Sequence, residues 1–245
     1  SDLSPLSSLT GLTELRIANP DVSDLTPLSS LTELTTLYLD DGDLFSSAIT
    51  DLSPLAGLKK LQVLCIPPMP NYTDFSCLSG LTELRTLRMM GTASSGSNSI
   101  QSLDFLAGMT KLETLRLVAA SGDLSVISGL VNLRSLTLHA DTYTEGTEIF
   151  KNLTNLEELS LRNSVIVTKD MSGFSGLTKL HRLNLIVSGI ESLAGLESLT
   201  DMQEMEISVQ GSGSFSDLTP LSGMTKLQRL SLYAGNSSAP LSLEP

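Results

Sequence analysis

One stretch of this chain recurs almost unchanged, and it constrains the fold more than any other feature. Residues 24–39 read DLTPLSSLTELTTLYL, and close copies occupy residues 2–17, 51–66 and 217–232. Less exact copies, which keep the apolar pattern, occupy the region between them. A fixed-period repeat stacks unit on unit, so it sets the architecture of the chain and removes the need for one central core.

Within each copy lies the apolar signature L-x-x-L-x-L, which can be placed ten times. It opens at Leu12, Leu34, Leu61, Leu84, Leu112, Leu133, Leu156, Leu180, Met202 and Leu227. Successive openings are 21 to 28 residues apart, which is the spacing of leucine-rich repeats. The end of each signature alternates between apolar and outward positions and predicts a short strand. Strands are expected near residues 14–17, 36–39, 63–66, 86–89, 114–117, 135–138, 158–161, 182–185, 204–207 and 229–232.

Between the strands, a hydroxyl residue followed by proline, as in Thr26-Pro27, marks a turn. We expect the Thr26 hydroxyl to cap a helical turn and Pro27 to take its first position. The sequence therefore predicts one leucine-rich-repeat domain over residues 1–245, an α/β solenoid of horseshoe form. Its parallel sheet would line the concave side, and short helical or 3₁₀ turns the convex side. Because residues 2–17 open on a half-repeat, we also expect a fragment of a longer protein.

The pattern D-[LI]-[ST]-P-L-x-x-L-[TK]-x-L-x-x-L-x-L resembles the internalin-type leucine-rich repeats of bacterial surface proteins. It is also similar to the phosphatase-regulating repeat subunits of eukaryotic cells. The resemblance covers residues 2–233 and departs in one feature. Internalin-type repeats usually place Asn shortly after the strand, whereas Pro20, Gly42 and Thr92 hold that place in three of the repeats here. The resemblance implies the fold more strongly than the function, because fold and function are separable.

Charge and composition exclude several functions. The formal charge of −12 disfavours binding to nucleic-acid phosphates. An apolar run of about 18 residues, which a membrane span requires, does not occur, so no membrane insertion is expected. Cys65 is expected on the concave side of the coil and Cys77 on the convex side. Both are therefore predicted to be free thiols, since a disulfide requires close Cα atoms.

No catalytic constellation is present in the sequence. The only histidines, His139 and His181, have no Cys, His or carboxylate partner at metal-ligand spacing. No glycine-rich phosphate loop follows a strand and opens a helix, and no sharp turn carries a nucleophilic serine. The sequence predicts neither an enzyme nor a cofactor nor a metal site.

Insertions concentrate just after the strands, at Asp40–Ala48, Gly91–Ser99, Asp141–Glu148 and Gln210–Ser214. They are rich in Gly, Ser and Asp, so they are expected to project from one edge of the solenoid. Insertions on one face of a solenoid often form a binding surface. The alternative is that these loops have no function.

All eight arginines fall on or beside the expected strands, whereas the lysines avoid them. Arg85, Arg88, Arg116 and Arg134 should form a positive stripe on the concave face. One interpretation is that these guanidinium groups bind carboxylates of a partner. The other is that they pair with strand neighbours such as Glu113. The residues proposed for partner binding are Tyr38, Arg85, Arg88, Arg116, Arg134, Arg162, Arg182 and Tyr233.

These observations favour a non-catalytic module that binds a protein ligand, with a carboxylate-rich ligand as one candidate, through the concave sheet and the edge loops. The resemblance implies a bacterial surface or secreted protein. The alternative is an intracellular scaffold or an enzyme-regulating subunit. The sequence does not indicate an oligomeric state.

Overall fold

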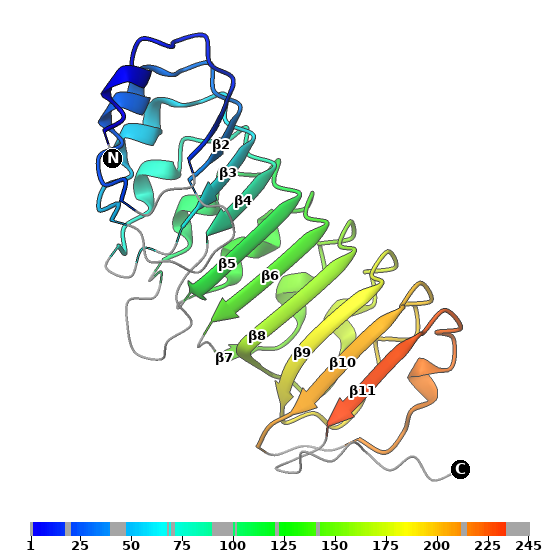
Figure 1. Ribbon diagram of the computed structural model, residues 1–245. Coiled ribbons are helices and arrows are strands. Elements are labelled where there is room, and N and C mark those ends of the chain that lie inside the picture. Colours follow the sequence, from blue (N-terminus) through cyan, green and yellow to red (C-terminus); the bar gives the residue numbers. More distant parts are fainter. Residues whose placement is uncertain are drawn as a thin grey trace. The chain divides into compact units, whose positions relative to one another are not determined.

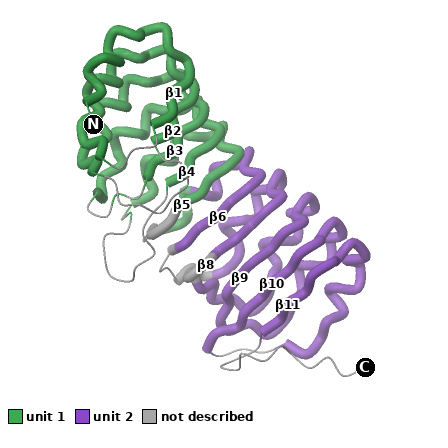
Figure 2. Tube along the Cα trace, in the orientation of Figure 1, with its two compact units in different colours: residues 1–126 green, residues 127–245 purple. Residues whose placement is uncertain are grey.

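The computed structural model describes residues 2–17, 21–39, 48–67, 69, 72–89, 100, 102–120, 123–140, 143–211 and 215–233. Side chains are not described at residues 118–120, 140, 143–145 and 162–164. The chain forms two compact units, Ser1–Val126 and Ile127–Pro245 (Figure 2). In each unit, coils of one strand and one short turn stack side by side (Figure 1). Each unit is thus a leucine-rich-repeat solenoid, as predicted, while the expectation of a single domain stays a prediction.

The sheet of the first unit is parallel, and each strand pairs with the next strand in sequence. Its strands are β1 (Glu14–Arg16), β2 (Thr36–Tyr38), β3 (Val63–Ile66), β4 (Thr86–Met89) and β5 (Thr114–Ala120). The turns between them are 3₁₀ helices on the opposite side of each coil (Figure 1). They are η1 (Ser4–Leu6), η2 (Thr26–Ser30), η3 (Ser53–Gly57), η4 (Ser76–Leu78), η5 (Asp104–Leu106) and η6 (Ser125–Gly129), which ends in the second unit.

The second unit repeats this arrangement, again with parallel pairing. Its strands are β6 (Ser135–Ala140), β7 (Tyr143–Glu145), β8 (Glu158–Val167), β9 (Arg182–Ser188), β10 (Glu204–Val209) and β11 (Arg229–Tyr233). Its 3₁₀ turns are η7 (Glu148–Phe150), η8 (Ser172–Phe174) and η9 (Thr219–Leu221). Strands occur at all ten expected places, and several continue past their expected ends.

The leucines of the signature form the core of each unit. Leu64, Leu87 and Leu115 lie opposite one another in successive strands, and each is 0% exposed. On the returning arm of the coil the leucines recur every third residue. The N–H of Leu28 donates to Leu25, that of Leu31 to Leu28, and that of Leu34 to Leu31, at 2.9–3.0 Å. Residues three apart eclipse one another in such turns, so the whole row faces the core.

The cap of each turn differs from the expectation. Thr26 is the first residue of η2 and Pro27 the second, so the predicted first position of the proline is also wrong. In η5 the Ser102 hydroxyl accepts the N–H of Asp104 at 3.1 Å. In seven other 3₁₀ turns the cap is the aspartate two residues before the Ser or Thr, whose carboxylate accepts the N–H of that residue at 2.8–2.9 Å. This bond is made by Asp2, Asp24, Asp51, Asp74, Asp123, Asp170 and Asp217. A carboxylate that bonds to the backbone two residues on forms a local turn by itself.

These hydrogen bonds favour the charged form of each aspartate. The hydroxyl and the backbone N–H of Thr26 lower the pKa of Asp24 below its ordinary value of 3.8. The other six capping aspartates shift in the same direction, because each is hydrogen-bonded by the Ser or Thr two residues on. The caps are therefore fully formed at neutral pH.

Two glycines allow neighbouring coils of the second unit to approach closely. The N–H of Gly173 donates to the buried Thr147 hydroxyl at 2.9 Å, and a Cβ on Gly173 would lie 2.1 Å from the Thr147 carbonyl oxygen. Gly195 has a φ of +106°, and a Cβ there would lie 2.3 Å from the carbonyl oxygen of Met171. Only glycine fits this combination of positive φ and close approach.

The insertion at Asp141–Glu148 was expected to be an irregular projecting loop, and this expectation is wrong. Its residues 143–145 form β7, which pairs with Val165–Val167 of β8, and Thr147 is buried. The strand forms because β8 continues beyond the usual repeat length and offers a free edge to pair with. Of the other insertions, residues 40–47, 91–99 and 212–214 lie outside the described residues. Among the described residues no helix is long and apolar enough to cross a membrane.

Candidate ligand-binding face of the sheet

Side chains between the core leucines stand on the outward face of the sheet, the side turned away from the coil interior. In the first unit, the strand register places Arg16, Tyr38, Cys65, Arg88 and Arg116 in one row across β1 to β5. We call these five residues the outer row. Because neighbouring strands lie about 4.8 Å apart, successive side chains of the row are adjacent.

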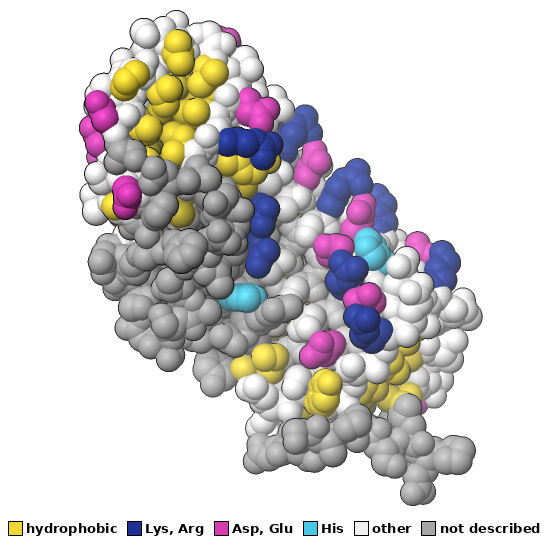
Figure 3. All heavy atoms as spheres, in the orientation of Figure 1, with side chains coloured by type: hydrophobic (Ala, Val, Ile, Leu, Met, Phe, Trp, Pro, Cys, Tyr) yellow, Lys and Arg dark blue, Asp and Glu magenta, His cyan; other side chains and the backbone are white. Residues whose placement is uncertain are grey.

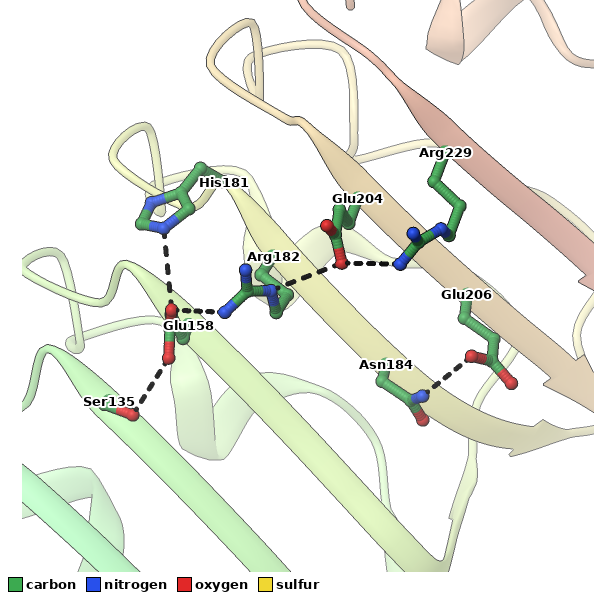
Figure 4. Close-up of polar contacts among 8 residues, drawn as sticks. All are labelled: Ser135, Glu158, His181, Arg182, Asn184, Glu204, Glu206 and Arg229. Carbon is green, nitrogen blue, oxygen red and sulfur yellow. Dashed lines mark hydrogen bonds and ion pairs between the residues drawn. The ribbon is translucent and has the colours of Figure 1, made fainter.

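In the second unit, a different row carries alternating charge. Ser135, Glu158, Arg182, Glu204 and Arg229 lie opposite one another across β6 and β8 to β11. Figure 4 shows that the side chains bridge from strand to strand, and we call this row the charge ladder. Arg182 bonds to Glu158 at 2.6 Å and approaches Glu204 at 3.4 Å, while Arg229 bonds to Glu204 at 3.2 Å.

Two further contacts involve the Glu158 carboxylate of the charge ladder. The Nε2 atom of His181 lies 3.7 Å from the Glu158 carboxylate, and the Ser135 hydroxyl donates to Glu158 at 3.4 Å. Two residues further along these strands, the Asn184 amide donates to Glu206 at 3.0 Å. On the face drawn in Figure 3, basic and acidic side chains accordingly lie interleaved over this unit.

Most of the other arginines are also paired with a glutamate, on a neighbouring coil or on their own strand. Arg85 bonds to Glu113 at 2.5 Å, and Arg134 bonds to Glu157 at 2.6 Å. Arg16 bonds to Glu14 at 2.8 Å, and its guanidinium lies 4.1 Å from the centre of the Tyr38 ring. These ion pairs are exposed, so each contributes little to stability, about 0–1 kcal/mol. Their effect is to hold the long side chains in fixed positions on the sheet.

Arg88 and Arg116 are the exception in the first unit. They lie directly opposite each other on β4 and β5, and both are half-buried. Among the described residues neither has a carboxylate partner or a hydrogen bond. The Nε of Arg116 is inaccessible to solvent and unpaired, and it is the only such side-chain atom in the described part of the chain. The structure therefore separates this pair from the arginines that bond to strand neighbours.

The predicted site residues are thus only partly brought together. Arg85, Arg88 and Arg116 share the sheet of the first unit with Tyr38, whereas Arg134, Arg182 and Tyr233 lie in the second unit. Tyr233 is half-buried at the end of β11. Arg162 lies in β8, but its side chain is not among those described. The prediction of one stripe that includes Arg134 stays a prediction.

Cys65 and Cys77 are not joined in a disulfide, as predicted. The Cys77 sulfur lies 3.7 Å from the Tyr72 hydroxyl. Burial, together with this contact, raises the pKa of Tyr72 to about 12. Burial also raises the pKa of Cys77, which keeps this thiol protonated and unreactive at neutral pH. No group of three His, Cys, Asp or Glu side chains within the described ranges is placed to hold a metal ion.

The coil geometry, the buried leucine ladder and the variable outward face together define a leucine-rich-repeat protein, as comparison with solved structures confirms. At the level of sequence, no family model and no curated protein matches this chain. The relation to the structures below is therefore one of fold.

Two of the similar structures are internalins of Listeria monocytogenes, as the repeat pattern predicted. The internalin inlF superposes with a TM-score of 0.68 at 24% identity, over 98% of this chain and 78% of that one. Internalin C2 superposes with a TM-score of 0.63 at 24% identity, over 91% and 82%. The ectodomain of the Arabidopsis receptor kinase HAESA, solved with a peptide hormone ligand, gives a TM-score of 0.74 at 20% identity. This match covers 95% of the present chain and 40% of that ectodomain.

Proposed function

We propose that this chain is a non-catalytic recognition module of a bacterial surface or secreted protein. It binds protein ligands through the outward face of its sheet and the loops that follow the strands. The observation that carries this proposal is the contrast between the two faces of the strands. The core positions of all ten signatures hold Leu, Ile or Met, whereas the outward position between them holds seven residue types.

This contrast matters because the outward side chains are not needed to build the coil. A stack of repeats is stabilised by contacts between neighbouring cores, so its outward face is free to vary with the ligand. The leucine-rich-repeat ectodomain of the Arabidopsis receptor kinase HAESA was solved in complex with a peptide hormone ligand, which supports a binding role for this fold. The bacterial surface location is inferred from the likeness to the Listeria internalins.

Blocking the outward face tests the binding proposal. Ligands are selected from a displayed peptide library on the full chain, and their Kd values are then measured for four tryptophan variants. Thr86→Trp and Ser160→Trp cover the outward faces of β4 and β8, and Ser79→Trp and Ser175→Trp place the same bulk beside the 3₁₀ turns. We expect a tenfold or greater loss of affinity for at least one sheet variant and less than a twofold change for both turn variants.

Equal effects of the sheet and turn variants would refute binding through this face. The location is tested separately on the complete gene product. A leader peptide and a cell-wall anchor would support a surface protein, and the absence of both would contradict it.

A further inference from the structure

The described arginine side chains on the sheet fall into two groups. Five of them bond to a glutamate, and all five are exposed: Arg16, Arg85, Arg134, Arg182 and Arg229. Arg88 and Arg116 make no such bond to any residue that the structure describes, although both are half-buried. Burial without a counter-ion is the opposite of what a purely structural role predicts, since a desolvated charge needs a partner more than an exposed one does.

The placement of the pair adds to this cost. Arg88 and Arg116 lie opposite each other on neighbouring parallel strands. Like charges in this arrangement repel and destabilise the sheet. The coil does not require arginine here, because the same position of β2 and β3 holds Tyr38 and Cys65.

The Nε of Arg116 is direct evidence that a hydrogen-bond partner is lacking. It is a buried donor without an acceptor in the described part of the chain. The described backbone around β4 and β5 does not supply one either. The described residues therefore leave the Arg116 guanidinium without a counter-ion, which a carboxylate of a ligand would supply.

We propose that Arg88 and Arg116 together form a binding site for a carboxylate group of the protein ligand. This inference rests on the proposed function and identifies the chemistry of one part of the ligand, an Asp or Glu side chain. Two guanidinium groups can each present a planar fork of N–H donors to carboxylate oxygens. Partial burial strengthens the attraction, because charges interact more strongly where water is excluded. The neighbouring outward residues Thr86 and Thr114 leave the pair without a competing charge on its own strands.

The test uses the full chain labelled with ¹⁵N and follows the Nε–Hε signals of the arginines by NMR. The probe is a hexaglutamate peptide, with hexaglutamine as the uncharged control and inorganic phosphate as the alternative anion. The test variant is Arg88→Gln/Arg116→Gln. The matched control is Arg16→Gln/Arg85→Gln, which removes the same charge from the same sheet but takes it from paired arginines.

We expect hexaglutamate to shift the Arg116 signal saturably and hexaglutamine to leave it unchanged. The test variant should lose at least tenfold in affinity and the control variant less than threefold. Equal losses in both variants, or no shift with hexaglutamate, would overturn the proposal. Phosphate binding that depends on Arg88 and Arg116, without hexaglutamate binding, would also overturn it and would assign the pair to phosphate.

The two proposals can fail separately. If the tryptophan variants leave ligand binding unchanged while hexaglutamate still needs the arginine pair, the proposed function is wrong and the anion site stands. If the sheet variants block the selected ligands but hexaglutamate binding does not depend on the arginine pair, the proposed function stands and the carboxylate site is wrong.

Discussion

Leu115→Ala tests whether the leucine ladder holds the coils together. Leu115 lies in β5 opposite Leu87 and is 0% exposed. Truncation to alanine removes three carbon atoms, which costs about 2.4 kcal/mol at about 0.8 kcal/mol per buried methylene. The cavity left behind adds to this loss, and measured values for buried leucines span about 2–5 kcal/mol. Because Leu87 and its neighbours are fixed in the sheet on one side, the site cannot collapse fully. We therefore expect a loss of about 3–4 kcal/mol.

Urea denaturation followed by far-UV circular dichroism measures this loss. The matched control is Thr114→Ala, one residue earlier on the same strand but on the outward face. Its expected effect is below about 1 kcal/mol, because that is the full span of β-sheet propensity. The reasoning would be refuted by a loss at Leu115 no larger than the loss at Thr114.

Three further predictions concern the outward face, the turns and the coil contacts. Arg88→Gln/Arg116→Gln should raise the Tm of the unliganded chain, because it removes the repulsion between the two half-buried charges. An unchanged or lower Tm would argue that these two guanidinium groups do not repel each other. The capping aspartates have lower pKa values in the folded chain than in the unfolded chain. Their contribution to the free energy of unfolding is therefore complete above the unfolded pKa of about 3.9. It is lost as the pH falls through the lower pKa values of the folded state. Urea unfolding at a series of pH values should therefore show stability falling below about pH 4, and replacing these aspartates by asparagine should flatten this dependence. Gly195→Ala should lower the free energy of unfolding by at least about 1–3 kcal/mol because of its positive φ alone, and so lower the Tm. Gly11→Ala is the control: nothing lies within 4 Å of its added Cβ, so its Tm should be nearly unchanged.

The sequence predicted the coil because leucine is placed by two simple periods. Alternation in Leu64-Cys65-Ile66 gives the strand, and a three-residue step in Leu25, Leu28 and Leu31 gives the returning arm. The caps were assigned to the wrong residue because Asp24 and Thr26 both carry oxygens that can satisfy a turn. Sequence preference alone does not say which of the two bonds to the backbone.

Strand β7 could not be predicted from its own residues. Tyr143–Glu145 carries no leucine signature, and it is a strand only because β8 runs on to Val167 and offers a pairing edge. Strand β8 also contains a shift of register against β9 between Ser160 and Val165. Such tertiary pairing is not visible in a local pattern.

The sequence predicted the neighbourhood of the arginines and the pairing of Arg85 with Glu113, but not the lack of a described partner at Arg88 and Arg116. Repeat spacing alone places Arg88 opposite Arg116, and the structure confirms this register. The ion pairs follow from the same spacing, because Arg85 and Glu113 hold one position of successive repeats, as do Arg134 and Glu157. That comparison singles out the two arginines without a glutamate beside them. Their half-burial, however, depends on the side chains around them and needed the structure.

The charge ladder also restricts how this repeat array can change length. Glu158, Arg182, Glu204 and Arg229 come from four successive coils. Loss of the coil that carries Arg182 would place Glu158 beside Glu204, and loss of the next coil instead would place Arg182 beside Arg229. Removal of both would restore opposite signs side by side. Recombination in this region should therefore be tolerated better when it deletes or duplicates coils two at a time.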